Sequence, residues 1–401
     1  RIAEIACFII SIDNGGLKMI QLPLKRLKPG MVMTQGIYNG SGDSFLSKGV
    51  SLTESYIQKL HDLGIASVTV TSMDPRDRIA PPEDVLEEKT RVLAVKRVYD
   101  IFQQVAKKGT FDVEPLMKAS SAIVKDILER RKNLVQLTDI RTHDMYTFAH
   151  SVNVAMLSAL IAVLVGMKQE EISDLTLSTL MHDLGKLSVP IEILNKPSRL
   201  TDEEFAVIKR HPRAGFERIQ SMKKLPNKDV LSIVALQHHE HMDGTGYPDR
   251  RKGKEIHIFG RISAIADVYD ALTSSRPYKK AYIPSIAYNI MANCSKGQFD
   301  EELLGLFFQN VAIYPTGTVL KTSLGYGVVK NVVFGKTDRP DIILFADCDK
   351  KLFFSPQEVD LYRDRKCVIE GVLKDMELYH FVHEIGFDPG ALLELQKESE
   401  M

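Results

Sequence analysis

The sequence predicts a mainly α-helical protein, in which a helical bundle lies between a small N-terminal α+β module and a small C-terminal β-rich appendage. Three observations support this fold class. Residues 139–308 show long apolar segments at helical spacing, separated by glycine and proline stops. Beyond residue 317 the pattern changes to β-branched runs and turns, from which we expect three to five short strands. Residues 21–72 mix short apolar runs with turn signals, and 401 residues exceed what one compact core usually supports.

The N-terminal module is expected to span residues 19–72. Thr53 is placed to cap a helix that ends at Gly64, and the apolar face of this helix carries Ile57, Leu60 and Leu63. The alternating residues 66–71 then predict a strand. Because this stretch contains no constellation of catalytic side chains, we interpret it as an accessory or sensing module.

A helical linker is expected over residues 73–121, beginning with a proline-rich stretch. Its first helix has an apolar stripe that runs up to Gly109 and consists of Val92, Val95, Phe102 and Val105. A second helix has a similar stripe, formed by Leu116, Ile123 and Ile127. These stripes either pair two copies of the chain as a homodimer or pack against the following domain, and we expect the second arrangement.

The composition limits the partners and the compartment. The 52 basic and 52 acidic residues leave a net charge of zero, which disfavours nucleic-acid polymers and charged membrane surfaces as partners. Four scattered cysteines without a CxxC spacing fit a reducing cytoplasmic setting. The longest apolar run, residues 152–167, is short for a membrane span and contains Asn153 and Ser158, so we expect a buried helix. Residues 1–18 lack the features of a secretory signal, and we expect Met19 to be the natural start.

Histidine and acidic side chains are concentrated in the helical domain. Eight of the eleven histidines fall between His143 and His257, and the densest segment, residues 237–248, reads QHHEHMDGTGYP. His182 and Asp183 lie in an apolar segment that we expect to be one continuous helix. Burying a neighbouring imidazole and carboxylate there is costly unless a metal ion compensates for the lost hydration. A single histidine on an apolar helix is more often a hydrogen-bonded core residue, but a cluster with acids indicates metal ligands.

Further candidate ligands occur at intervals along the same domain. They are His150 near the start of the long apolar helix, His211 at a helix start, His238 and His239 at a helix end, and Asp267 in an amphipathic helix. Asp267 could instead cap a helix or pair with an arginine, and Asp270 follows one turn later. Imidazole and carboxylate donors without thiolates suit iron, manganese or zinc. Because so many donors exceed the needs of one ion, we predict a pair of divalent metal ions.

Two further features each have a structural and a functional interpretation. Lys186 follows His182 by one helical turn, and it either forms a salt bridge with Asp183 or holds a substrate phosphate; we favour the phosphate. The DGTGYP segment is either an ordinary turn or a glycine hinge that places Tyr247 in the wall of a pocket, and we favour the wall.

Taken together, the motifs resemble a known enzyme family. HDLGK, KRHP, HHE, DGTGYP, ADVYDAL and RPYKKA occur in the order found in the HD-GYP branch of the HD phosphohydrolase superfamily, and the similarity covers residues 122–315. The resemblance implies an HD-type helical bundle catalytic domain over these residues. We expect the β-rich appendage at residues 316–370 and a C-terminal tail at residues 371–401.

The resemblance also implies roles for the site residues. One metal ion would be held by His150, His182, Asp183 and Asp267. The second would be held by Asp183, as a bridge, together with His211, His238 and His239. The positions that match substrate-binding residues are Lys186, Tyr247, Arg276 and Lys279. Some members bind a third metal ion through a glutamate at the position of Tyr146, so this chain resembles the two-metal subgroup.

From this resemblance we expect a cytoplasmic phosphodiesterase with two divalent ions, iron or manganese, that opens the bacterial second messenger cyclic di-GMP to pGpG. Whether GMP is formed next is left open. The ions would activate water and polarise the phosphoryl oxygens, and Asp183 and Lys186 are the expected catalytic residues. Two alternatives stay open: an enzyme for another cyclic dinucleotide, such as cyclic GMP-AMP, and a cyclic di-GMP receptor or partner-binding protein without useful turnover.

Overall fold

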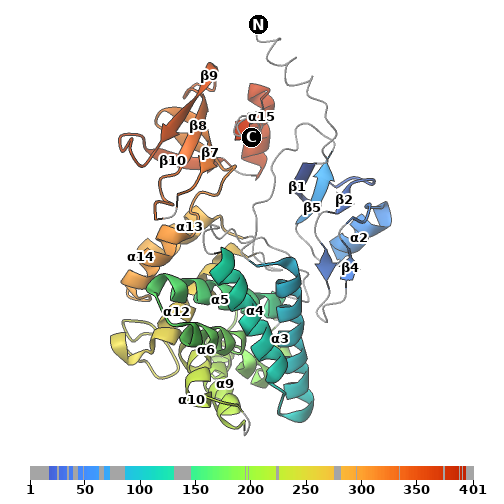
Figure 1. The fold of residues 1–401 in the computed structure, drawn as a ribbon, viewed down its shortest axis with the longest axis vertical. Helices are drawn as coiled ribbons and strands as arrows, with labels where there is room; N and C mark the ends of the chain where they lie inside the picture. The colour runs from blue at the N-terminus through green and yellow to red at the C-terminus, as the bar shows by residue number, and fades with distance from the viewer. Residues whose placement is uncertain are drawn as a thin grey trace. The chain divides into compact units, whose positions relative to one another are not determined.

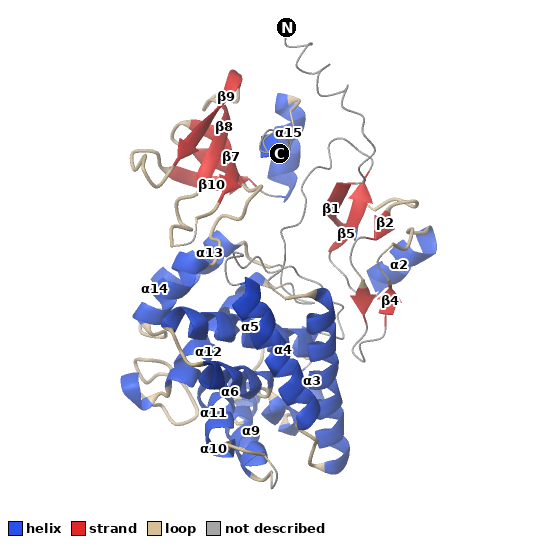
Figure 2. Cartoon of the chain, viewed as in Figure 1, coloured by secondary structure: helices blue, strands red, loops and turns tan. Residues whose placement is uncertain are grey.

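The structure of the chain is a computed structural model. It describes residues 18–24, 27–33, 36–38, 44–47, 49–62, 67–72, 86–130, 146–194, 196, 198–222, 225–274, 281–294, 296–333, 335–373, 375–387, 389–390 and 392–393. The chain divides into two compact units, residues 1–36 with 46–81 and residues 37–45 with 82–401, and each is described by itself. Figure 1 shows the course of the chain, and Figure 2 shows its helices and strands.

The first unit has the predicted α+β composition. Its antiparallel sheet has the order β1-β5-β2, with strands β1 (Lys18–Pro23), β2 (Val32–Met33) and β5 (Ser67–Ser72). Helix α2 (Glu54–Asp62) begins as predicted, because the Thr53 Oγ1 accepts a hydrogen bond from the Tyr56 N–H at 3.2 Å. The expected helix end at Gly64 lies outside the described residues. Strands β3 (Ile37–Tyr38) and β4 (Ser44–Leu46), most of whose residues belong to the second unit, pair with each other in a two-stranded sheet.

Most of the second unit is helical, which confirms the predicted fold class (Figure 2). Its longer helices are α3 (Glu88–Lys108), α4 (Glu114–Arg130), α5 (Tyr146–Val165), α6 (Gln169–Leu180), α9 (His211–Gln220), α12 (Ile258–Thr273) and α14 (Glu301–Asn310). Shorter segments connect them: η3 (Leu184–Ser188), α7 (Ile191–Leu194), α8 (Asp202–Ile208), α10 (Lys228–Leu231), α11 (Ile233–Gln237), η4 (Gly253–Glu255), α13 (Pro284–Asn289) and η5 (Ile290–Cys294).

Helix α5 is the centre of this helical domain. It packs against α6, α12, α3, α4 and α14. The window Phe148–Val165 is long and apolar enough to cross a membrane, but 78% of it is buried inside the protein. The helix is therefore a core helix, as its polar interruptions predict, and its apolar character is explained by burial on all sides.

The two stripes of the predicted linker pack within the chain. Val95, Phe102 and Val105 of α3 are buried in the same hydrophobic core as the residues of α5, and so are Leu116, Ile123 and Ile127 of α4. Gly109 ends α3 in a left-handed conformation, with φ of 70°. For these six residues the packing is the second of the two expected arrangements, and Val92 of the first stripe is only partly buried.

The C-terminal appendage is a five-stranded antiparallel sheet, within the predicted range of strand number. Its order is β10-β6-β7-β8-β9, and its strands are β6 (Val319–Thr322), β7 (Gly325–Asn331), β8 (Asp341–Ala346), β9 (Leu352–Asp360) and β10 (Ile369–Leu373). Helix α15 (Asp375–Ile385) covers one face, where Phe381 lies 4.5 Å from the Tyr326 ring, centre to centre. The expected boundary at residue 370 falls inside β10. This strand pairs with β6, so the sheet extends to Leu373.

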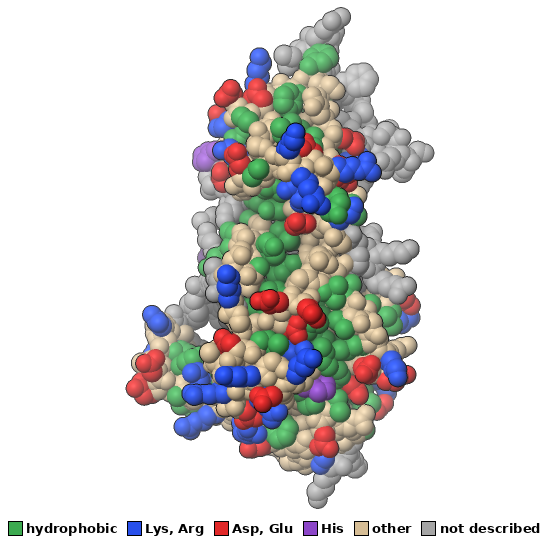
Figure 3. Space-filling model, turned by 90° about the vertical axis from the view of Figure 1, so that its left-hand side faces the viewer, with side chains coloured by type: hydrophobic (Ala, Val, Ile, Leu, Met, Phe, Trp, Pro, Cys, Tyr) green, Lys and Arg blue, Asp and Glu red, His purple; other side chains and the backbone are tan. Residues whose placement is uncertain are grey.

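The surface charge follows the composition. On the face of the molecule shown in Figure 3, acidic and basic side chains are interspersed among apolar ones. This mixture agrees with the net charge of zero. We therefore expect the chemistry of the chain to depend on a local site and not on the electrostatic field of the whole surface.

Candidate metal centre

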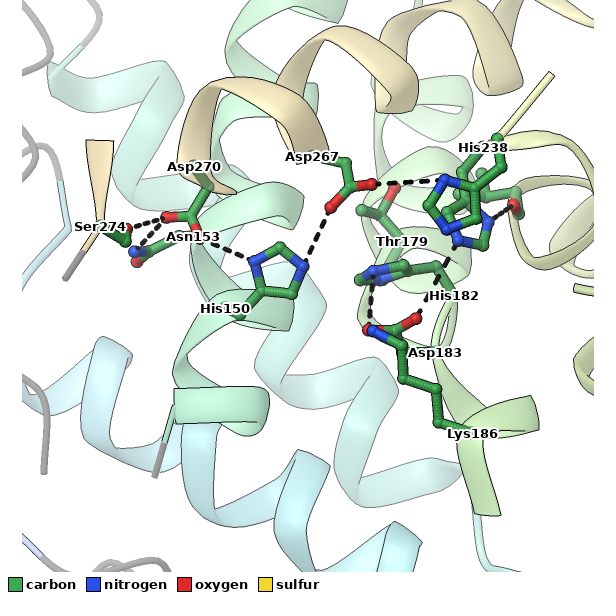
Figure 4. A network of polar contacts seen from close by, with 12 residues as sticks. His150, Asn153, Thr179, His182, Asp183, Lys186, His238, Asp267, Asp270 and Ser274 are labelled. Carbon is green, nitrogen blue, oxygen red and sulfur yellow. Dashed lines mark hydrogen bonds and ion pairs between the residues drawn. The ribbon is translucent and has the colours of Figure 1, made fainter. Parts of the chain in front are cut away.

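The seven predicted metal ligands lie together in the helical domain. They come from five places in the chain: α5 (His150), the turn after α6 (His182 and Asp183), the start of α9 (His211), the end of α11 (His238 and His239) and α12 (Asp267). Figure 4 shows this network, with the side chains of His150, Asp183 and Asp267 directed toward a common centre. Their potential ligand atoms form three overlapping groups, and within each group all atoms lie within 4.8 Å of one another.

The first group consists of His150, His182 and Asp267. The His150 Nε2 lies 3.0 Å from the Asp267 Oδ1. The rings of His150 and His182 are 5.5 Å apart, centre to centre, with an angle of 65° between their planes. Two imidazole nitrogens and one carboxylate oxygen therefore converge on one point, which is a donor set that suits a borderline divalent ion.

The second group consists of His211, His238 and His239. The Nε2 atoms of His211 and His238 are 3.3 Å apart, and the rings of His238 and His239 are 4.0 Å apart, centre to centre. Two ring nitrogens at this separation are close enough to share one ion. His239 is the most exposed member, because its side chain retains 26% of its accessible surface.

Asp183 lies between the two groups. Its Oδ2 is 3.3 Å from the His182 Nε2, whereas its Oδ1 is 3.6 Å from the His211 Nε2. The His238 Nε2 is 4.0 Å from the same Oδ1. One carboxylate thus presents a separate oxygen to each group, and this is the geometry that a bridging ligand requires.

Three of the imidazoles are held by the main chain. The Nδ1 atoms of His182, His211 and His238 lie 2.7–2.8 Å from the carbonyl oxygens of Thr179, Ile208 and Val234, respectively. Each carbonyl lies three or four residues before its histidine, near the end of a helix, and those of Thr179 and Val234 also accept the main-chain N–H of the same histidine. Because a carbonyl only accepts, the proton sits on Nδ1 and the Nε2 lone pair is directed toward the cluster, as in other metal-binding histidines.

His150 is held differently, by a buried carboxylate. Its Nδ1 lies 2.7 Å from the Asp270 Oδ2, and Asp270 has no exposed surface. Asn153 and Ser274 donate hydrogen bonds to the other Asp270 oxygen, at 2.8 and 3.0 Å. Sequence reasoning noted Asp270 and Asn153 without giving them a role. Their spacing carried a signal, because each lies three residues from a predicted ligand on the same helix.

The pKa shifts favour the neutral imidazole at three of the histidines and the ionised carboxylate at Asp183. Burial lowers the pKa of His211 to about 4 and that of His239 to about 3, and it holds the pKa of His238 well below its usual value. Burial favours the neutral acid at Asp183, but His182 and then Lys186 hold its pKa well below the ordinary value. His150 is the exception, because its contacts with Asp267 and Asp270 outweigh burial and raise its pKa to about 9.

The residues present fit a divalent metal. The His182 Nε2 and the Asp183 Oδ1 are buried, and neither has a hydrogen-bond partner among the described residues. Leaving such atoms unsatisfied costs about 1–3 kcal/mol each. Both atoms belong to the converging groups, so a bound cation would satisfy them at once.

The predicted helix through His182 and Asp183 is wrong in its extent. Helix α6 ends at Leu180, and His182 and Asp183 lie in a turn before η3. Neighbouring residues of a continuous α-helix point about 100° apart. The turn instead allows both side chains to face one cluster, while the apolar residues of α6 remain in the core.

Lys186 forms a salt bridge with Asp183, which from the sequence was the alternative to binding a substrate phosphate. Its Nζ lies 2.6 Å from the Asp183 Oδ2, and its side chain retains 26% of its accessible surface. The ammonium group is therefore at the edge of the cluster and in contact with its central carboxylate. The phosphate role of Lys186 stays a prediction.

The GYP turn places Tyr247 beside the cluster. The ring of Tyr247 is 4.8 Å from that of His239, centre to centre, and its N–H donates to the His239 carbonyl at 3.0 Å. A Cβ on Gly246 would lie 2.5 Å from the same carbonyl, so only glycine fits there. The buried Glu240 accepts hydrogen bonds from the N–H groups of Asp249 and Arg251, which holds the turn in place.

Two predicted substrate residues, Arg276 and Lys279, lie outside the described residues, and so does the side chain of Tyr146. Their expected roles stay predictions.

Comparison with known proteins bears on this site directly. The HD domain family model matches residues 119–303. A cyclic di-GMP phosphodiesterase of Pseudomonas aeruginosa is 31% identical over 324 residues, covering 79% of this chain and 76% of the relative. The chain belongs to the HD-GYP family. HD domain phosphohydrolases use divalent metal ions, and the histidine and aspartate groups described above could bind them.

Other HD-GYP relatives match a smaller part of the chain. A cyclic di-GMP phosphodiesterase response regulator of Xanthomonas campestris is 33% identical over 224 residues, which is 55% of each chain. A 3'3'-cGAMP-specific phosphodiesterase of Vibrio cholerae is 35% identical over 192 residues, covering 47% of this chain and 36% of the relative. The chain thus spans about half or less of these two relatives, and their names include two different cyclic dinucleotides.

Proposed function

We propose that this HD-GYP protein is a metal-dependent phosphodiesterase that opens cyclic di-GMP to the linear dinucleotide pGpG. The observation that carries the proposal is the pair of three-donor groups with Asp183 between them. Two adjacent divalent ions are a recurrent arrangement for in-line displacement at phosphorus. The names of relatives from Pseudomonas aeruginosa and Xanthomonas campestris support the choice of substrate.

The two ions are proposed to be iron or manganese. His150, His182, Asp183 and Asp267 would hold the first, and Asp183, His211, His238 and His239 would hold the second. Nitrogen and oxygen donors without thiolates support such ions. When bound, the ions supply a water nucleophile at neutral pH and Lewis-acid polarisation of the phosphoryl oxygens.

The remaining side chains would bind and orient the cyclic dinucleotide. Lys186, at the edge of the cluster, donates to a non-bridging phosphate oxygen in place of part of its contact with Asp183. Arg276 and Lys279 are proposed to contact the second phosphate. Tyr247 forms part of the pocket wall, next to His239.

A cytoplasmic location and a free dinucleotide substrate belong to the same proposal. The exposed Cys348 and the buried Cys367 are both free thiols, which supports a reducing compartment. The net charge of zero supports a small substrate over a nucleic-acid polymer.

Cyclic GMP-AMP is the second candidate substrate, because relatives named for this dinucleotide match at similar identity. The two candidates differ in one base and share both phosphodiester bonds. A panel of purified cyclic dinucleotides therefore distinguishes them.

The test uses the full chain, purified without air and loaded with Mn²⁺ or Fe²⁺. Each cyclic dinucleotide is incubated with the enzyme, and the products are separated by chromatography, with Asp183→Ala as the inactive control. We expect selective conversion of cyclic di-GMP to pGpG. Preferential cleavage of cyclic GMP-AMP would replace the substrate, and tight binding of cyclic di-GMP without product would make the protein a receptor.

A further inference from the structure

A chain of buried polar contacts runs from His150 to the first turns of α3. Asp270 accepts from the His150 Nδ1 at 2.7 Å and from the Asn153 Nδ2 at 2.8 Å. The Asn153 Oδ1 in turn accepts from the Arg91 Nη1 at 2.6 Å. The three backing side chains, Arg91, Asn153 and Asp270, are all buried. Figure 4 shows the part of this chain from Asn153 to His150.

The donors and acceptors of this chain allow only one order. A guanidinium group only donates, so Arg91 turns the Asn153 amide with its oxygen toward α3 and its NH₂ toward Asp270. An ionised carboxylate only accepts, so Asp270 requires the proton of His150 to lie on Nδ1. The second ring nitrogen, Nε2, lies 3.0 Å from the Asp267 Oδ1 in the cluster, so it is the nitrogen that would face a metal ion once its own proton is lost. Arg91 therefore orients Asn153, and Asn153 positions the carboxylate that holds the Nδ1 proton of His150, three contacts away from Arg91.

The position of His150 in its helix explains why side chains take this role. The other three backed histidines lie at helix ends, where the Nδ1 of each ring reaches a carbonyl three or four residues earlier in the chain. His150 is the fifth residue of α5, where nearby carbonyls already accept helical hydrogen bonds. The acceptor for its Nδ1 comes from another helix and is Asp270 of α12.

Stability alone does not account for these residues. Buried ionic groups carry a large desolvation cost, and apolar residues of similar volume often give equal or greater stability. The end of α3 that carries Arg91 is also fixed, because the Glu87 N–H donates to Asp126 at 3.0 Å and Arg130 pairs with Glu87 at 2.7 Å. A fixed cation at this point is expected where the geometry of a site depends on it.

We propose that Arg91, Asn153 and Asp270 are positioning residues for the metal centre, and that they hold His150 in the tautomer and orientation that bind the ion of the first group. Arg91 lies outside residues 119–303, which the HD domain model matches. The first turns of α3 are thus a working part of the site and more than a linker. This inference rests on the proposed metal-binding function.

The test measures metal affinity and not only turnover. Mn²⁺ is titrated calorimetrically into the metal-free full chain, and Co²⁺ is titrated with its visible absorption as a spectroscopic signature of the ligand set. Three variants are tested: Arg91→Met, Asn153→Leu and Asp270→Asn. Each is expected to lower the affinity for one of the two metal ions about 10- to 100-fold, the usual effect of losing the hydrogen-bond partner of a metal ligand. Excess metal should restore most of the turnover of Arg91→Met.

The matched control is Arg97→Met, on the same helix. Arg97 is partly exposed and pairs with Asp100 of the same helix at 3.1 Å. It is not part of the chain of contacts that leads to His150. We expect its metal affinity to equal that of the wild type. Arg91→Lys, which keeps the charge but not the planar fork, should recover part of the lost affinity.

A double-mutant cycle covers the case in which a variant is merely less stable. If Arg91 acts through Asp270, Arg91→Met should lower the metal affinity much less in an Asp270→Asn background than in the wild type. Two outcomes would overturn the positioning role: additive effects of Arg91→Met and Asp270→Asn on metal affinity, or wild-type affinity in all three variants. If the wild type still binds two ions and cleaves cyclic di-GMP, the proposed function stays intact. Failure of the wild type to bind metal would overturn both.

Discussion

The two halves of the metal centre are positioned by different means. In the half around His211 and His238, each ring is held by a carbonyl that lies three or four residues earlier in the chain. In the half around His150, the ring is held by Asp270, which is 120 residues away; Asp270 is held by Asn153 of α5, and Asn153 is held by Arg91 of α3. The first of these halves is therefore built from local helix ends, whereas the half around His150 combines one such helix end, at His182, with the packing of α3, α5 and α12.

This difference has an energetic consequence. A main-chain carbonyl stays in place as long as its helix does, so the local half depends on few side chains. The remote half needs several buried polar groups to be satisfied together, and losing one leaves the others unpaired at a cost of about 1–3 kcal/mol each. We therefore expect the remote half to be the more sensitive one to substitutions away from the ligands.

The largest effect is expected where the two halves meet. Asp183→Ala removes the carboxylate that faces both groups, so both ions should be lost. Turnover should fall by about a thousandfold or more, because metal ions supply several kcal/mol of transition-state stabilisation. Metal content and hydrolysis of cyclic di-GMP by the purified variant measure this. Full activity in Asp183→Ala would show that Asp183 is not a bridge.

A comparison of His150→Ala with His211→Ala tests whether the halves are separate. Each variant should retain one ion per chain, and turnover should fall by about a hundredfold or more, since both ions are needed for the displacement. Elemental analysis gives the number of ions, and the Co²⁺ spectra of the two variants should differ. Loss of both ions in each variant would mean that the two groups form a single site.

Lys186→Ala separates phosphate binding from metal binding. The ammonium group touches Asp183 without being a candidate ligand, so both ions should remain. Loss of a hydrogen bond to a charged group costs about 1.5–3 kcal/mol, which corresponds to about a 10- to 100-fold lower kcat/KM. Steady-state kinetics and metal analysis check this expectation. Loss of an ion in Lys186→Ala would give the lysine a role in holding Asp183 instead.

The smallest effect is expected for Ser274→Ala, at the outer edge of the remote half. It removes one of the hydrogen bonds to Asp270, which should lower the free energy of unfolding by about 1 kcal/mol and lower the affinity for one metal ion by a few-fold. Ser178→Ala is the matched control, because Ser178 is a buried serine with one hydrogen bond, to the Leu231 carbonyl at 2.7 Å. It should lose similar stability, measured by denaturant unfolding, and keep its metal affinity. Equal affinities in both variants would show that Ser274 does not contribute to positioning.

Sequence patterns predicted much of the fold because the signals were local. The stripes of α3 and α4, the cap of α2 by Thr53 and the β-rich appendage follow from spacing and turn residues. The error at His182 and Asp183 has the same origin. An apolar run of helical spacing gives no stop before His182, and the turn there depends on packing against α9, where a Cβ on Gly185 would collide with the His211 carbonyl.

The sequence by itself determined which side chains are candidate ligands, since imidazole and carboxylate chemistry is a property of the residue. Only the tertiary structure decided that Asp183 faces both groups and that Arg91, Asn153 and Asp270 stand behind His150. Contacts between helices far apart in the chain depend on how their apolar faces pack, and one sequence does not encode that packing in any local pattern.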